Sequence, residues 1–240
     1  MKNAIADKEL IAEQLKKQMS PEDQAIVKKM SAAQKDELFA GNADYSAALS
    51  NEKAVTKEWG MGGDSNRALN AVTIAITGAL GGQTDLQVAS NALAPYAAQV
   101  IGQQFGHGED KNTAAQLVSH AILGATLAYI NGGDPTAGGS AAVASEAAAN
   151  YLTNQLAEKY KDDPKYFVNG EFQANLLSET EKAQIRDLTA GIGAVIGGAV
   201  GDSTYNAQLA GVIGQNAVEN NGFSIIDENY GKVVKENTKV

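Results

Sequence analysis

The sequence predicts a mainly α-helical protein, a compact multi-helix domain whose helices pack closely through small residues. Hydrophobic residues make up 44% of the chain but aromatic residues only 6%, and there are 25 glycines. Apolar residues recur at helical spacing, and glycine pairs separate the periodic stretches. A chain of 240 residues is long enough to bury a substantial core, as one large or two smaller domains.

The first part of the chain, residues 1–60, predicts an amphipathic helical N-terminal segment. Ile5, Leu10 and Leu15 lie on one helical stripe among Lys, Glu and Gln. Ser20 and Pro21, followed by two acidic residues, are typical of a helix start. A glycine-rich loop after Trp59 then interrupts the pattern, so we place a domain boundary there.

The central region, residues 61–221, predicts six longer helices. Between residues 66 and 108 the only charged side chains are Arg67 and Asp85. So few charges indicate a segment that is buried or meets a partner or lipid. We expect Pro95 to kink or divide the second helix. The expected helices are 67–80, 86–105, 111–130, 140–161, 179–200 and 205–217.

A short β-hairpin is predicted at 166–172, because Asn169-Gly170 joins two short aromatic runs. The tail, 222–240, has too few apolar residues to bury a core. We therefore expect it to be the incomplete start of a downstream toxin or entry region.

Charge and composition exclude several kinds of site. The net charge of −9 opposes binding to nucleic acid or anionic lipid through bulk electrostatics. Without cysteine there is no disulfide, thiolate nucleophile or cysteine-bound zinc, and with two histidines there is no histidine-rich metal site. We expect no cofactor and no metal, although the composition does not exclude a metal site made mainly of carboxylates. No signal peptide opens the chain, so an export signal would lie on a longer precursor.

No stable transmembrane helix is expected. The longest uncharged apolar runs, 117–130 and 188–201, have fourteen residues each, whereas a spanning helix needs roughly 20. Gly193, Gly197 and Gly201 share one helical face, which permits close approach of backbones in a membrane or in a soluble helix pair. We favour soluble packing and keep conditional membrane contact as the alternative.

The two histidines do not predict a catalytic pair. Ser119 and His120 are neighbours in sequence and point to different faces of a helix, so we expect His120 to be a buried interhelix residue. His107 lies between two glycines and is expected to be a loop residue.

Asn221 carries chemistry of its own. Its side-chain nitrogen can attack its own carbonyl, closing a succinimide and cutting the chain before Gly222. Alternatively, the next backbone nitrogen attacks the side chain and produces deamidation. Gly222 hinders neither closure, and the outcome depends on the imposed geometry and a nearby acid or base. We expect Asn221 as the reacting residue, with Glu219 and Asn220 as neighbours.

The peptide Val218-Glu219-Asn220-Asn221 resembles the VENN motif that ends the pretoxin domain of CdiA-type contact-dependent growth inhibition exoproteins. The likeness covers about 67–221. It is also carried by Ser119-His120-Ala121-Ile122-Leu123-Gly124-Ala125, Leu177-Ser178-Glu179-Thr180-Glu181-Lys182, Gly197-Gly198 and Gly201-Asp202-Ser203.

This resemblance implies a module of a large exoprotein, secreted to the surface of the producing bacterium. It would help transfer a C-terminal toxin, its partner in cis, into the envelope or periplasm of a target cell, together with envelope or translocation components there. It also implies that the toxin region begins at VENN and is freed there. Cyclisation of Asn221 would make this release a single-turnover autoproteolysis rather than turnover of a substrate. Two alternatives stay open: a structural helical spacer or interaction domain of a surface filament, and a hydrolase using buried carboxylates.

Overall fold

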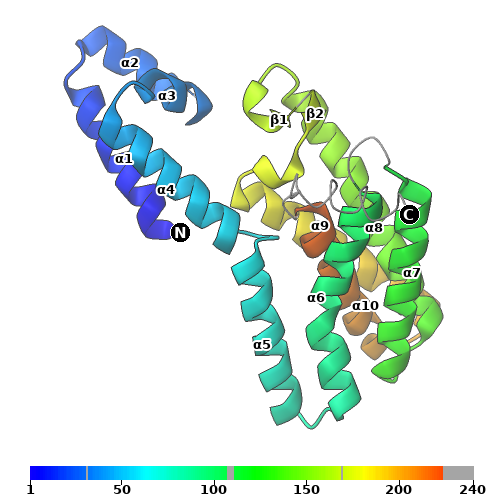
Figure 1. The fold of residues 1–240 in the computed structure, drawn as a ribbon. Helices are drawn as coiled ribbons and strands as arrows, with labels where there is room; N and C mark the ends of the chain where they lie inside the picture. Colours follow the sequence, from blue (N-terminus) through cyan, green and yellow to red (C-terminus); the bar gives the residue numbers. More distant parts are fainter. Residues whose placement is uncertain (31, 107–110, 169, 224–240) are drawn as a thin grey trace, which may run out of the picture. The chain divides into compact units, whose positions relative to one another are not determined.

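A computed structural model describes residues 1–30, 32–106, 111–168 and 170–223. The chain divides into two compact units, Met1–Gly60 and Met61–Val240. Both are built from α-helices, which confirms the mainly α fold class (Figure 1). His107 and most of the tail 222–240 lie outside the described residues.

The first unit contains four helices: α1 (Lys2–Lys17), α2 (Pro21–Lys29), α3 (Ala32–Phe39) and α4 (Ala43–Trp59). The predicted start of α2 is confirmed, because the Ser20 side chain accepts a hydrogen bond from the Asp23 amide. The small core of the first unit contains Val27, Phe39 and Tyr45.

The second unit contains the six longer helices close to their predicted positions. Short 3₁₀ turns lie at Pro164–Tyr166 and Ala174–Leu176, and a π-helical turn, η3, lies at Val218–Gly222. The helices are α5 (Asp64–Leu80), α6 (Asp85–Phe105), α7 (Thr113–Ile130), α8 (Pro135–Lys159), α9 (Glu179–Gly201) and α10 (Thr204–Ala217).

Small residues set the distances between these helices. α8 packs against α7, α9 and α10, and α9 packs along α10. A Cβ atom added at Gly124 of α7 would lie 2.5 Å from the Gly138 carbonyl oxygen of α8, so the two backbones are in contact. Ala141 and Ala142 are fully buried on the same helix. The predicted small-residue packing is confirmed.

The sequence predicted that Pro95 would kink or divide α6. The helix is not divided there. It runs unbroken from Asp85 to Phe105 with Pro95 inside it and buried. Packing against its neighbours outweighs the loss of one backbone hydrogen bond.

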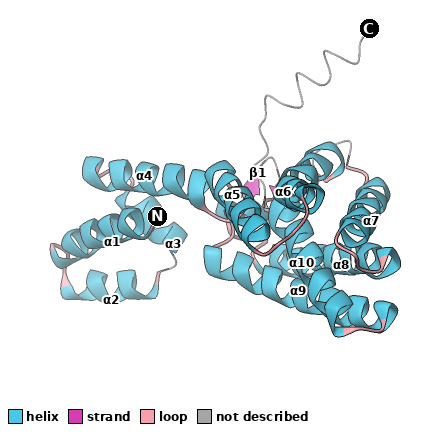
Figure 2. Cartoon of the chain, turned by 90° about the horizontal axis from the view of Figure 1, so that it is seen from below, coloured by secondary structure: helices cyan, strands magenta, loops and turns pink. Residues whose placement is uncertain are grey.

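The predicted hairpin is confirmed. The strands β1 (Phe167–Val168) and β2 (Glu171–Phe172) pair antiparallel and are very short (Figure 2). Gly170 has φ +81°, a backbone conformation that glycine adopts without strain. Asn169 lies outside the described residues.

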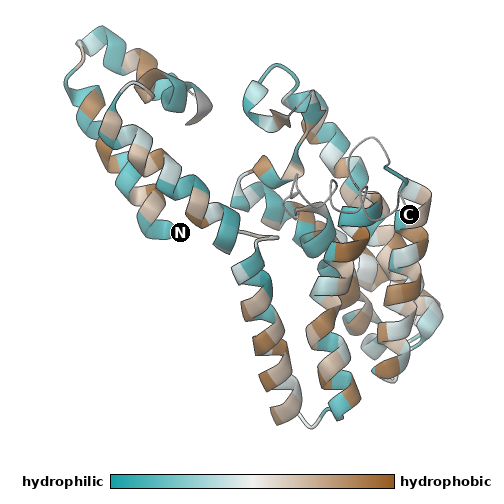
Figure 3. Ribbon diagram, in the orientation of Figure 1, coloured by the Kyte–Doolittle hydropathy of each residue, from teal (hydrophilic) through white to brown (hydrophobic). Residues whose placement is uncertain are grey.

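Apolar side chains are exposed along α5. Leu69, Val72, Ile76 and Leu80 lie on one side of this helix and are more than half exposed. Figure 3 shows hydrophobic residues recurring along the α5 ribbon. In the described part of the chain, one helix, α7, is long and apolar enough to cross a membrane by length and composition alone. A core helix can satisfy the same criterion, so this is weak evidence for a span.

Two glycines of α9 provide a matched test of the packing. Gly197→Ala would place a methyl group against the Ala210 side chain of α10, so we expect a loss of about 1 to 3 kcal/mol of stability. Gly191→Ala meets no atom within 4 Å and should gain about 0.5 to 1 kcal/mol through helix propensity. Urea denaturation checks both. Equal effects of the two substitutions would contradict close α9–α10 packing.

Candidate functional site: the buried VENN turn

The VENN peptide forms the π-helical turn η3, which continues α10 into the core of the second unit. The turn packs against α6, α8 and α9 as well as α10. Val218 is 0% exposed, Asn220 5% and Asn221 1%, so three residues of a polar motif lie almost entirely out of water. Single π-helical turns inside helices are rare and occur frequently at functional sites.

Two apolar side chains anchor the ends of this turn. Val218 and Phe223 are buried in one hydrophobic cluster with Ala149, Leu177 and Ile185. Phe223 therefore belongs to the core of this unit, two residues beyond the predicted end of the domain at Asn221. From residue 224 onward, the predicted downstream region lies outside the described residues.

The Asn221 side chain is held by a buried glutamate. Its Nδ2 donates to Oε1 of Glu146 on α8 at 2.5 Å, and Nε2 of Gln116 on α7 donates to the same oxygen at 2.8 Å. His120 Nε2 lies 4.0 Å from the other carboxyl oxygen, Oε2. All four side chains are at most 3% exposed. An amide, a carboxyl group and an imidazole are thus buried side by side.

Glycine in α6 makes room for this arrangement. A Cβ atom at Gly102 would collide with the Asn221 amide, which therefore lies directly on the α6 backbone. The Asn221 side chain is clamped between α6 and α8.

Burial sets the protonation states in this cluster. It raises the pKa of Glu146 to about 8, although the Asn221 amide and the charge of Lys111 oppose the shift. Burial also lowers the pKa of His120 to about 4, and the hydrogen bond with Asn221 partly opposes this. Both groups are therefore predominantly neutral at pH 7, since the charged form of each is disfavoured out of water.

The other two polar residues of the motif face α5. Arg67 Nε donates to Asn220 Oδ1 at 3.2 Å, and its Nη2 donates to the Gly62 carbonyl at 2.8 Å. Asn70 Nδ2 donates to Glu219 Oε1 at 3.4 Å, and burial raises the pKa of Glu219. These contacts fix the turn to α5, whereas the Asn221 side chain contacts α8.

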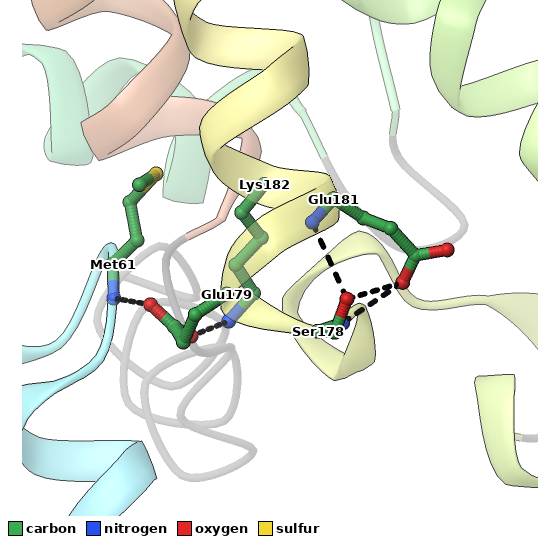
Figure 4. Close-up of polar contacts among 5 residues, drawn as sticks. All are labelled: Met61, Ser178, Glu179, Glu181 and Lys182. Carbon is green, nitrogen blue, oxygen red and sulfur yellow. Dashed lines mark hydrogen bonds and ion pairs between the residues drawn. The ribbon is translucent and has the colours of Figure 1, made fainter. Parts of the chain in front are cut away.

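A second network holds the loop before α5 against α9. The Met61 amide donates to Glu179 Oε2 at 2.7 Å, and Lys182 Nζ lies 2.9 Å from Glu179 Oε1 (Figure 4). Ser178 and Glu181 form a capping box at the start of α9. Because this loop leads into α5, the network helps to position Arg67.

A small pocket of about 90 Å³ opens beside the clamped asparagine. Polar residues among its lining include Lys111, Glu146, Asn150, Asn175 and Asn221. Within the described ranges there is no group of three or more His, Asp or Glu side chains that would hold a metal ion.

The partners of Asn221 could not be predicted from the sequence. The prediction that His120 is a buried interhelix residue is confirmed. Gln116 and Glu146 were not predicted. No spacing rule relates either of them to Asn221, and Glu146 alone lies 75 positions before it in the chain. One signal was present: Glu146 is the only charged residue in the alanine-rich run 141–149.

Comparison with known proteins identifies the class. Residues 174–224 match the family described as "Pre-toxin domain with VENN motif". This segment contains α9, α10 and the whole buried turn. The chain therefore carries a pre-toxin domain of this family, as the sequence resemblance predicts.

The wider chain is similar to proteins named CdiA. It is 31% identical to "Toxin CdiA" of Escherichia coli over 172 residues, which are 72% of this chain and 5% of that protein. It is 32% identical to "tRNA nuclease CdiA" of Yersinia mollaretii over 197 residues, 79% of this chain and 6% of that protein. "16S rRNA endonuclease CdiA" of Enterobacter cloacae is 39% identical over 111 residues, 46% of this chain and 3% of that protein. No solved structure matches.

The chain thus spans only about a twentieth of the length of these relatives. The similarity defines a segment of a CdiA-type protein.

The protonation states predict an unusual dependence of stability on pH. Between pH 4.5 and 8 the folded state binds more protons at Glu146 than the unfolded state, so stability falls as pH rises. Between pH 4 and 6.5 the folded state binds fewer protons at His120, so stability rises with pH. The two effects offset each other from 4.5 to 6.5, and the loss from 6.5 to 8 is about 2 kcal/mol.

Urea denaturation at a series of pH values checks this expectation. Glu146→Gln keeps an uncharged group of similar shape, so it should remove the decline between pH 6.5 and 8. An exposed acid of the same helix, Glu158, provides the control, and Glu158→Gln should leave the decline intact. A wild-type protein whose stability is unchanged from pH 6.5 to 8 would contradict a neutral buried Glu146.

Proposed function

We propose that this chain is a delivery and release module of a CdiA-type exoprotein, which assists transfer of a C-terminal toxin into target bacteria and lets it separate at VENN. The family match to residues 174–224 supports the assignment to the region before a toxin. The clamped Asn221 supports a chemical role for the motif beyond marking a boundary.

The names of the relatives support a role other than toxicity. One relative is named a tRNA nuclease, another a 16S rRNA endonuclease and a third, from Yersinia pseudotuberculosis, a deoxyribonuclease. The shared segment stays similar while the named activity changes. We assign this segment the step that different toxins have in common, with the toxin domain as its partner in cis.

The release step is cyclisation of Asn221 and cleavage before Gly222. The observation that carries this proposal is the burial of the amide together with its hydrogen bond to Glu146. Cyclisation requires one conformation out of many, and a held side chain loses little further entropy on reaching it. Asn221 also lies near the C-terminal end of its turn, where helix carbonyls lack an intrahelical donor.

Partners and location follow from the same assignment. As part of a larger exoprotein, the module is secreted to the surface of the producing bacterium and meets the target-cell envelope or translocation components. The exposed apolar side of α5 supports conditional contact with a membrane during this step. We propose no nucleic-acid partner.

The small pocket favours single-turnover chemistry over a hydrolase. Pockets for external ligands usually have volumes of about 300 to 1,000 Å³, and the pocket beside Asn221 has about 90 Å³. Its polar groups surround an amide of the chain itself.

Intact mass measurement tests the release step. We expect the wild-type chain to yield a fragment ending at Asn221, at first one water lighter than the free acid because it ends in succinimide. Asn221→Ala cannot cyclise and should stay whole. Each protein is incubated at low and high pH, with and without vesicles of zwitterionic lipid. A wild-type chain that stays whole under all these conditions would rule out release at this bond.

A deletion in the parent exoprotein distinguishes a role in toxin delivery from a role as a structural spacer. Removing residues 67–200 should abolish growth inhibition of target cells, since the helices that hold the turn are lost. A control parent carrying a helical segment of equal length in their place keeps the filament length. If that control inhibits targets as the intact protein does, the module is a spacer.

A further inference from the structure

We infer that Glu146 is the proton shuttle of the cleavage step, taking a proton from the Asn221 amide and returning it to the Gly222 nitrogen. This inference rests on the proposed release at Asn221 and adds the residue that performs it. Nothing in the motif itself points to Glu146, which lies on a different helix.

The contact is direct and selective. Glu146 Oε1 accepts a hydrogen bond from Nδ2, the nitrogen that must act as nucleophile. A neutral amide nitrogen is a poor nucleophile, and removal of its proton by an adjacent base activates it. Glu219 belongs to the motif, but its carboxylate accepts from Asn70 on α5. Of these two glutamates, Glu146 is the one that accepts a hydrogen bond from the Asn221 amide.

The step balances without any other reactant. Glu146 in its charged form accepts a proton from Asn221 Nδ2, and Nδ2 forms a bond to the Asn221 carbonyl carbon. The bond from this carbon to the Gly222 nitrogen then breaks, and the Glu146 proton passes to that nitrogen. The products are a C-terminal succinimide and a free amine, and Glu146 is charged again.

The surroundings of Glu146 make this shuttle dependent on pH. Gln116 donates to Oε1, while His120 lies beside Oε2 in its neutral form. The positive charge of Lys111, before α7, lowers the pKa of this carboxyl group and so opposes the effect of burial. The carboxyl oxygen Oε2 has no hydrogen-bond partner among the described residues and is available to carry a proton.

The active form of the shuttle is therefore scarce at neutral pH. Burial raises the pKa of Glu146 to about 8, so this carboxyl group is largely protonated at lower pH. Cleavage is therefore slow below pH 8. Each pH unit below this value reduces the charged form about tenfold. Movement of Lys111 toward the carboxylate, or entry of water into the adjacent pocket, would favour the charged form.

The experiment measures the rate of fragment formation from the full 240-residue chain between pH 6 and 10. We expect the wild-type rate to rise about tenfold per pH unit up to about pH 8 and then to level off. Glu146→Gln should lower the rate at least a hundredfold at pH 9, since general-base catalysis contributes about 10² to 10⁴. Glu158→Gln, on the exposed side of the same helix, should cleave as the wild type does.

The outcomes separate this inference from the proposed function. If the wild type cleaves before Gly222 but Glu146→Gln cleaves at the same rate, release stands and the shuttle is wrong. A wild-type rate that is independent of pH also overturns the shuttle, and needs no variant to fold. If the wild type never cleaves, both fail together. Circular dichroism and urea denaturation of Glu146→Gln distinguish lost chemistry from lost structure.

Discussion

The second unit depends on a polar turn that is buried and must find partners inside the protein. Asn220 and Asn221 each bring an amide group into the core, and an unpaired buried amide costs about 1 to 3 kcal/mol. Arg67 on α5 donates a hydrogen bond to the Asn220 amide, and Glu146 on α8 accepts one from the Asn221 amide. These two bonds require α5 and α8 to lie on either side of the turn that continues α10.

The close helix packing serves this same requirement. A side chain at Gly102 would occupy the volume of the Asn221 amide, and side chains at Gly124 or Gly138 would separate α7 from α8, which carry Gln116 and Glu146. The low aromatic content and the many glycines of the chain therefore have a structural role at this site. They bring backbones near enough for short polar side chains on different helices to meet.

Much of this architecture could be predicted from sequence because its determinants are local. The cap residue Ser20 before Pro21, the glycine pairs between helices and the helical periodicity define the helices to within a few residues. The motif, and Asn221 within it, could be recognised for the same reason. The partners of Asn221 could not, because the contact with Glu146 joins residues 75 apart and depends on how the helices pack. The helix over 86–105 was predicted, but it is not divided at Pro95, because tertiary packing outweighs the local rule.

The anchoring of Val218 and Phe223 on either side of Asn221 has a mechanical consequence. Tension applied to the chain beyond Phe223 reaches that aromatic anchor first, and the Asn221 amide is loaded only after Phe223 has left its cluster. The Asn221–Gly222 bond lies between the two anchors. A weak pull leaves the clamp undisturbed, while a pull strong enough to extract the Phe223 ring transfers its load directly to the Asn221–Gly222 bond.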